Sequence, residues 1–210
     1  MPDPRTQLEA ALLYAITPDA EPEEVERLVA AYLRGGVDVV QLRHKSLVRG
    51  RLLELACRLR RLTAESGRLF VVNDHLDVAL VSRADGVHLG ADDLSLPAAR
   101  RVAGPDLLLG ASASTALAAR KAVGEGADYI GCGAAFATPV KSGKRVIGPR
   151  GVARVAAAVA VPVFAIGGVE ETNLPRLLKA GVRRVCVIRA LAGAPDPEAA
   201  ARRLRRLLAA

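Results

Sequence analysis

Eight short hydrophobic runs recur along the 210-residue chain, and longer amphipathic stretches separate them. The runs are nearly continuous in apolar residues, which is typical of parallel strands that helices cover from outside. They span residues 12–16, 37–42, 69–72, 86–89, 107–111, 128–132, 161–166 and 184–188. Eight strand–helix units predict an α/β fold, a single (β/α)8 TIM barrel over residues 1–210. A doubly wound sheet is the alternative, but the regular spacing of the units favours closure.

The stretches between the runs carry signals for the start and end of helices. Residues 21–36 begin with glutamates and end with two glycines, which suits the helix dipole and a C-terminal cap. Residues 114–127 begin with Ser-Thr as an N-cap, and residues 173–182 predict a short helix. The arginine-rich stretch 198–210 is interpreted as the last helix of the fold, with an amphipathic helix on a membrane surface as the alternative.

The composition limits the classes of partner. A net charge of +8 suits nucleic acid or anionic metabolites, but aromatic residues make up only 3% of the chain and Trp is absent. Many arginines fall in helical stretches, where they predict solvated helix faces. The charge therefore suits anionic metabolites, and we expect neither nucleic acid nor a membrane as a partner. Homo-oligomer formation stays open.

Cysteine spacing and the N-terminus bear on the compartment. Cys57, Cys132 and Cys186 show no CxxC spacing, and each lies among apolar residues. We expect three small buried side chains and no zinc site. The first ten residues lack the apolar region of a signal peptide, and no hydrophobic run reaches membrane-spanning length. These features predict a cytoplasmic protein.

Polar residues alternate after the second hydrophobic run, in the segment QLRHK. The period of two places Gln41, Arg43 and Lys45 on one face, inside the barrel near its mouth. A solvated polar face of an edge strand is the alternative, although a closed barrel has no edge. Two cations beside an amide suit a polyanionic ligand.

Acidic residues follow the third and fourth runs. Asn73 and Asp74 come after the third run, and Asp92 and Asp93 after the fourth. Neighbouring strands would bring one carboxylate each to a shared point. One or two carboxylates, completed by water and substrate phosphate, are the ligands typical of Mg²⁺. Capping of the next helix is the alternative, and the spacing does not choose between the two.

Hydroxyl, lysine and glycine residues follow the last four runs. They are Ser112, Ser114 and Thr115 after the fifth run, Thr138, Lys141 and Lys144 within the irregular segment 133–150, Gly167 and Gly168 after the seventh, and Arg189 after the eighth. At least one of the three hydroxyls is expected to cap a helix. The lysine-rich segment suggests a phosphate loop, although it lacks the Walker A order. Loops after strands seven and eight of barrels often bind phosphate. Together these residues predict an enzyme for phosphorylated small molecules without specifying its reaction.

Five segments together resemble the thiamine phosphate synthase family, which includes the related thiazole tautomerases. They are LYAITPD, GGVDVVQLRHK, VVNDHLDVALVSRADGVHLGADDL, GADYIGCGAAFATPVKSGK and VPVFAIGGV, and the resemblance runs from about residue 12 to 190. It implies a (β/α)8 barrel and a transferase. The implied reaction joins hydroxymethylpyrimidine diphosphate to thiazole phosphate, giving thiamine phosphate and pyrophosphate.

The resemblance also implies roles for individual residues. Asp74 and Asp93 match the ligands of a Mg²⁺ cofactor. Arg43, Lys45 and Lys141 would serve catalysis by neutralising the charge of the leaving group. The implied substrate-binding residues are Gln41, Arg43, Lys45, Asn73, Ser112, Thr138, Lys141, Gly168, Ile188 and Arg189. No protein nucleophile is needed, which fits a sequence without a recognisable Ser-His-Asp or Cys-His arrangement.

Four positions depart from the family pattern. The family usually has Gln at Ala91, His at Ser114, a second Thr at Val140 and Ser at Arg189. The tautomerases use a His that aligns with Ser114 as their acid–base catalyst, so an isomerase is the weaker alternative. A non-catalytic binder of thiamine-related phosphates is a further alternative. His88 is interpreted as a packed interior histidine.

Overall fold

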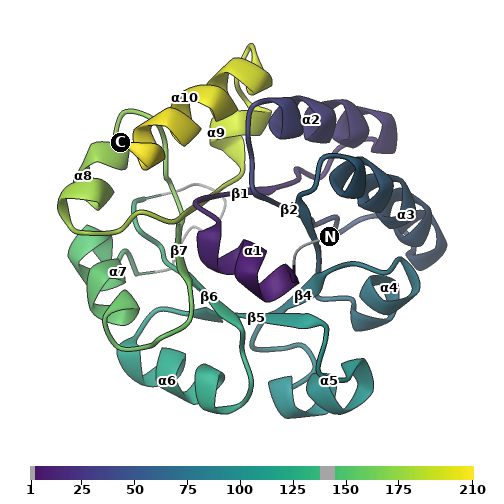
Figure 1. Cartoon of the computed structure of the whole chain (residues 1–210), viewed down its shortest axis with the longest axis horizontal. Helices are drawn as coiled ribbons and strands as arrows, with labels where there is room; N and C mark the ends of the chain where they lie inside the picture. The colour runs from purple at the N-terminus through teal and green to yellow at the C-terminus, as the bar shows by residue number, and fades with distance from the viewer. Residues whose placement is uncertain (1–2, 138–144) are drawn as a thin grey trace.

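The computed structural model describes residues 3–137 and 145–210, and its eight parallel strands close into a barrel in chain order (Figure 1). Strand β8 pairs with β1, where Val185 lies opposite Leu13, so the barrel has no open edge. The predicted (β/α)8 barrel is confirmed and the doubly wound alternative is excluded. The strands are β1 (Leu13–Ile16), β2 (Val39–Leu42), β3 (Leu69–Asn73), β4 (Gly86–Leu89), β5 (Leu108–Ala113), β6 (Tyr129–Cys132), β7 (Val163–Ile166) and β8 (Val185–Val187).

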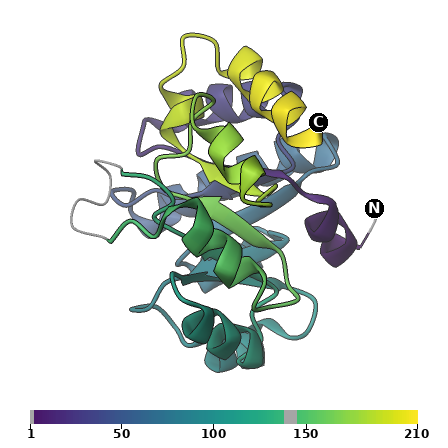
Figure 2. The same ribbon diagram turned by 90° about the vertical axis from the view of Figure 1, so that its left-hand side faces the viewer.

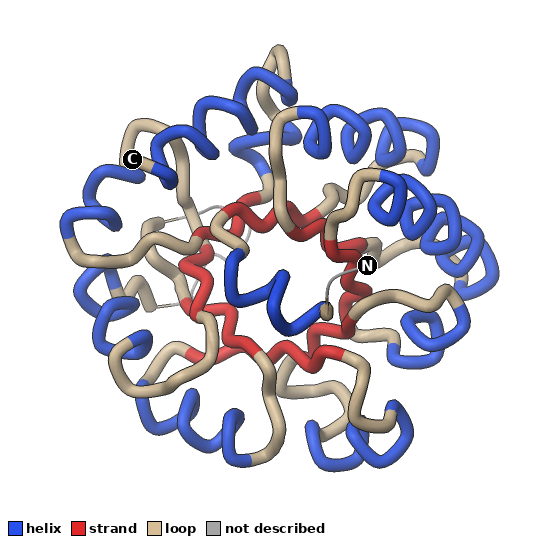
Figure 3. The backbone as a smooth tube through the Cα atoms, viewed as in Figure 1, coloured by secondary structure: helices blue, strands red, loops and turns tan. Residues whose placement is uncertain are grey.

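Helices surround the barrel and cover its outer face (Figures 2 and 3). These are α2 (Pro22–Arg34), α3 (Arg49–Glu65), α4 (Leu76–Val81), α5 (Leu96–Ala103), α6 (Ala116–Gly124), α7 (Gly148–Ala156), α8 (Leu174–Lys179), α9 (Arg189–Ala192) and α10 (Pro197–Ala209), whereas α1 (Pro4–Ala10) lies apart from them. The four helical stretches predicted from end signals correspond to α2, α6, α8 and α10. Helix α10 packs against α2, α9 and β1, so the C-terminal stretch is the last helix of the fold.

Two apolar layers hold the barrel together. One lies between strands and helices, and the other fills the barrel interior. Tyr14, Tyr129 and Phe164 form the interior floor, with Phe164 edge-on to both tyrosines at centroid distances of 5.3 and 6.0 Å. Gly110 makes room for this floor, because a Cβ atom there would lie 2.1 Å from Cζ of Tyr129. The chain has six Tyr and Phe residues in total, and three of them thus pack together inside the barrel.

One aspartate precedes each of the strands β2, β4 and β6, and its carboxylate caps the strand before it. Backbone N–H groups donate to these carboxylates from Leu13 to Asp38 (3.0 Å), from Phe70 to Asp85 (2.8 Å) and from Leu109 to Asp128 (2.8 Å). Each carboxylate also pairs with an arginine. These acids lie at the N-terminal ends of the strands. Residues at this end of a barrel contribute to stability rather than to catalysis.

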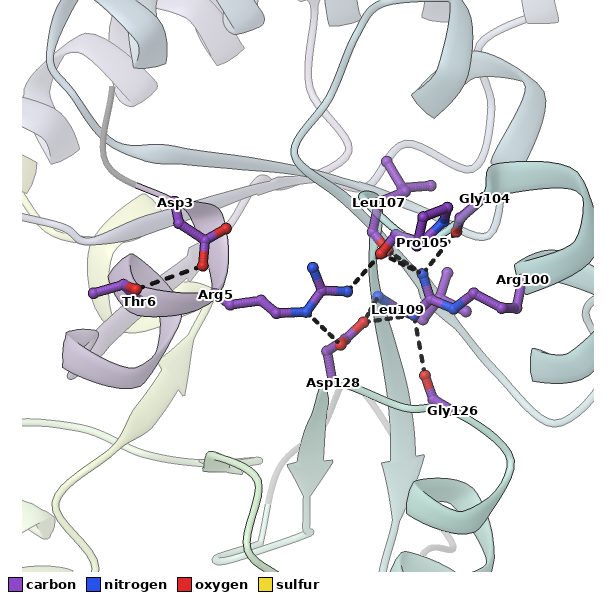
Figure 4. Close-up of polar contacts among 10 residues, drawn as sticks. All are labelled: Asp3, Arg5, Thr6, Arg100, Gly104, Pro105, Leu107, Leu109, Gly126 and Asp128. Atoms are coloured by element: carbon purple, nitrogen blue, oxygen red, sulfur yellow. Dashed lines mark hydrogen bonds and ion pairs between the residues drawn. The ribbon is translucent and has the colours of Figure 1, made fainter.

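The helix α1 was not predicted, and it lies across the N-terminal opening of the barrel (Figure 1). Its Leu8 is 2% exposed and belongs to the interior layer. Arg5 donates to the Pro105 carbonyl at 2.6 Å and pairs with Asp128 at 3.3 Å (Figure 4). Asp128 also binds Arg100 at 2.7 Å, so one carboxylate ties the helix to the ends of β5 and β6.

The cysteine prediction was wrong at one position. Cys132 and Cys186 are buried as expected, but Cys57 is exposed on α3. The helical period explains the difference, because Leu55, Ala56 and Leu59 supply the buried face of that helix. Among the described residues, no helix combines the length and apolar character needed to cross a membrane.

Candidate active site

A cavity of about 1120 Å³ opens at the C-terminal ends of the strands. Seven of the predicted site residues line it: Lys45, Asp74, Asp93, Ser112, Gly168, Ile188 and Arg189. Gln41, Arg43 and Asn73 lie outside its lining. Thr138 and Lys141 lie outside the described residues, as does the departure at Val140. The structure therefore brings most of the predicted residues from six strand ends to one cavity.

The carboxyl groups of Asp74 and Asp93 lie within hydrogen-bonding contact of each other. Asp74 directly follows β3, where its backbone N–H donates to the His88 carbonyl of β4 at 2.8 Å. Its φ of 65° falls in the left-handed region, which aspartate tolerates better than most residues. Oδ2 of Asp93 accepts from the Gly90 N–H at 2.7 Å. Helix α5 begins after Ser95, so the alternative that Asp92 or Asp93 caps that helix is wrong.

The Asp93 carboxyl opposes the ionisation of Asp74. Burial raises the pKa of Asp74 most, and the hydrogen bond and charge of Asp93 raise it further. Lys45 and Arg43 lower the pKa, and the balance leaves it at about 6 instead of 3.8. Among the described residues, no cluster of three or more His, Cys, Asp or Glu could hold a metal. The two aspartates would thus hold a cation only together with oxygen ligands from elsewhere.

Asp19 anchors the loop that carries the two cations. Its carboxylate accepts from the Lys45 backbone N–H at 2.6 Å and pairs with the Arg43 guanidinium at 3.3 Å. The buried hydroxyl of Thr17 accepts from the Arg43 N–H at 3.0 Å and donates to the Arg43 carbonyl. Neither anchoring residue was predicted from the sequence, although both belong to the segment LYAITPD. Their only signal was a threonine and an aspartate directly after the first strand.

The alternation of Gln41, Arg43 and Lys45 does not place all three side chains in the cavity. Gln41 is 2% exposed, and its amide donates to the Tyr14 hydroxyl at 2.8 Å in the barrel interior. Strand β2 ends at Leu42, so Arg43 and Lys45 lie in the following loop and do not follow the alternation of the strand. Lys45 reaches the cavity, and Arg43 turns to Asp19.

His88 is more than a packed interior histidine. Its ring packs at a tilt on Tyr129, with centroids 5.6 Å apart, as an interior position predicts. Nδ1 also lies 3.2 Å from the Tyr129 hydroxyl, and Nε2 lies 3.0 Å from the Ser112 hydroxyl at the cavity wall. This Ser112–His88–Tyr129 arrangement was not predicted from the sequence, because its members come from three different strands.

The remaining loops supply hydroxyl and backbone groups. Thr115 caps α6 by accepting from the Ala118 N–H at 3.2 Å, so one of the three hydroxyls is a cap as expected. Gly167 and Gly168 have φ of 97° and 64°. A Cβ atom on Gly168 would lie 2.4 Å from the Ala137 carbonyl oxygen, so a side chain is excluded there. Glycine at this position therefore lets the segment around Phe136 and Ala137 pack closely against the backbone after β7.

Residues 13–191 match the model of a family described as thiamine monophosphate synthase. The chain is 44% identical over 195 residues to a thiamine-phosphate synthase of Gloeobacter violaceus, covering 93% of this chain and 57% of that protein. It is 45% identical over 182 residues to a thiamine-phosphate synthase of Moorella thermoacetica. This match covers 86% of this chain and 87% of that protein. The chain thus spans little more than half of one relative and most of the other.

A solved structure gives the same answer. The thiamine phosphate pyrophosphorylase from Pyrococcus furiosus superimposes with a TM-score of 0.86 at 38% identity. The match covers 98% of this chain and 97% of that one. The similarity therefore extends over the whole barrel.

Proposed function

The chain belongs to the thiamine monophosphate synthase family, and from this premise we propose that its cavity joins hydroxymethylpyrimidine diphosphate to thiazole phosphate. The products would be thiamine phosphate and pyrophosphate. The observation that carries the proposal is the pairing of Asp74 and Asp93 beside Lys45 in the same cavity. A diphosphate-leaving reaction requires such a site, because negative charge develops on the leaving group.

The residues present fit a Mg²⁺ ion. Asp74 and Asp93 supply two carboxylates from neighbouring strand ends, and oxygen donors of this type suit a hard cation. Burial raises the pKa of Asp74 most, and the neighbouring Asp93 carboxyl raises it further, as expected where two carboxyl groups share a partly buried site. When bound, the ion would neutralise charge on the leaving diphosphate.

The chain's own residues would bind and orient the substrates. Lys45 and Arg43 lie close enough to lower the pKa of Asp74, so their positive charge extends over the proposed diphosphate position. The C–O bond to the diphosphate breaks with both electrons on the leaving oxygen, and the thiazole nitrogen forms the new C–N bond. Lys141 and Thr138 are proposed from the family resemblance alone to contact the substrates from the loop after β6.

The second substrate would occupy the opposite wall of the cavity. Gly168, Ile188 and Arg189 line that wall at the ends of β7 and β8. The Arg189 guanidinium suits a phosphate monoester. Arg189 would thus add a cation at a position where the family usually has a serine. Ser114 also lines the cavity and supplies no acid–base group in place of the tautomerase histidine.

The test is synthesis of thiamine phosphate by purified protein from both substrates, with Mg²⁺ or with EDTA. We expect product only with Mg²⁺. Asp93→Ala should lose turnover, whereas Asp77→Asn, which changes an exposed surface pair with Arg49, should keep it. Undiminished turnover of Asp93→Ala at saturating Mg²⁺ would contradict the mechanism. Isomerisation of a thiazole carboxylate phosphate without Mg²⁺ would instead support the tautomerase alternative.

A further inference from the structure

We propose that Gln41, Tyr14 and Tyr129 are positioning residues, because the hydrogen bonds that join them run in one direction toward the cavity. This series of hydrogen bonds holds neutral His88 with its proton on Nε2. Ser112 is the last member of this series and lies at the cavity wall, where it presents its own hydroxyl proton to the ligand. The role of Ser112 toward a substrate rests on the proposed function, whereas the tautomer of His88 does not.

The Gln41 amide is the first donor in this series of hydrogen bonds and sets its direction. An amide nitrogen can only donate, and Nε2 donates to the Tyr14 hydroxyl at 2.8 Å. The Gln41 amide also hydrogen-bonds Tyr129, and its nitrogen cannot accept, so among the described residues the Tyr14 proton has the Tyr129 hydroxyl as its acceptor, 2.9 Å away. Gln41, Tyr14 and Tyr129 are each at most 2% exposed, so bulk water does not compete for these bonds.

The same logic fixes the tautomer of His88. The Tyr129 oxygen accepts from Tyr14, so its proton goes to Nδ1 of His88 at 3.2 Å. A neutral imidazole that accepts at Nδ1 carries its proton on Nε2. Nε2 therefore donates to the Ser112 hydroxyl oxygen at 3.0 Å.

This polarity decides what Ser112 can do. In a serine nucleophile site, a carboxylate accepts from Nδ1–H and leaves Nε2 free to take the serine proton. Here a phenol donates to Nδ1, so Nε2 is already protonated and cannot act as that base. The Ser112 oxygen accepts from the imidazole, and its proton remains for an acceptor in the cavity. An anionic phosphate oxygen is the ligand group that such a donor recognises.

Nitrogen NMR of ¹⁵N-histidine-labelled protein at pH 8 measures the tautomer directly. A His88→Gln variant identifies the His88 signals among the three histidines. We expect the Nε2–H form in the wild-type protein and a mixture of tautomers in Tyr129→Phe, which keeps the ring and removes only the hydroxyl. Tyr32→Phe is the matched control, since the buried Tyr32 hydroxyl has no hydrogen-bond partner among the described residues. An Nδ1–H form in the wild type, or an unchanged tautomer in Tyr129→Phe, would overturn the proposal.

Activity then tests the link to Ser112. We expect Tyr129→Phe to lower kcat/KM about fivefold, as loss of one hydrogen bond between neutral groups would, and Tyr32→Phe to leave it unchanged. In a Ser112→Ala background, Tyr129→Phe should have no further effect, because the chain acts through that hydroxyl. Additive losses would overturn the positioning role. Failure of synthase activity in the wild type would refute the proposed function and leave the tautomer result standing.

Discussion

The Asp74 carboxyl should titrate near pH 6 in the metal-free protein, and Asp93→Asn should lower its pKa. With a pKa of about 6, roughly a tenth of Asp74 is ionised at pH 5 and about nine tenths at pH 7. Removing the Asp93 charge leaves burial as the main cause of the raised pKa. Carbon NMR of ¹³C-labelled aspartate carboxyls measures the titration, and Asp74→Asn identifies the signal.

Asp92→Asn is the matched control, because Asp92 lines the same cavity but is not among the causes of the raised pKa. It should leave the Asp74 titration in place. A wild-type midpoint near pH 4, or a midpoint that Asp93→Asn does not move, would refute the account of the carboxyl pair.

The same pKa sets how stability and metal binding depend on pH. A carboxyl pKa raised in the folded state contributes stability that is fully present below about pH 4 and is lost as pH rises through 6. Mg²⁺ requires the ionised carboxylates, so its binding competes with the proton. Added Mg²⁺ should therefore raise Tm more at pH 7 than at pH 5. Equal shifts at both values would contradict the assignment of Asp74 as a ligand.

Two further predictions concern the floor and the loop of the site. Gly110→Ala should cost about 1–3 kcal/mol by overpacking against Tyr129, and should lower Tm in thermal unfolding by about 2–4 °C per kcal/mol. Gly124→Ala, with no atom within 4 Å of the added Cβ, should not lower Tm, and a wild-type Tm for Gly110→Ala would count against the packing argument. Asp19→Ala should raise KM for the pyrimidine diphosphate about tenfold, because Lys45 loses its backbone anchor and a charge-assisted bond. Steady-state kinetics that show an unchanged KM would contradict this anchoring role.

The strands were predictable because each is an apolar run buried on both faces. Residues directly after the strands were also good candidates for the cavity, since the C-terminal strand ends of a barrel meet there. Asp74 illustrates this rule, Asp93 follows β4 by four residues, and Ser112 lies within the last two residues of β5. Lys141 and Thr138 lie outside the described residues, so their place in the site remains a prediction.

The sequence was less informative where contacts cross the barrel. Helix α1 buries only Leu8 and carries no apolar period, so its seven residues gave no helix signal. The hydrogen bonds from Gln41 to Ser112 join side chains of five strands, and no local pattern reveals such a set. Gln41 was predicted to face the cavity because it alternates with Arg43 and Lys45. The alternation did not indicate that β2 ends at Leu42.

The most direct test of the central claim is a single-turnover measurement of thiamine phosphate and pyrophosphate from the same reaction. The account predicts equal amounts of both products, formed at one rate, only when Mg²⁺ and both substrates are present. Pyrophosphate released at the same rate without thiazole phosphate would show hydrolysis rather than transfer. That result, or no product from folded protein that binds both substrates, would contradict the account.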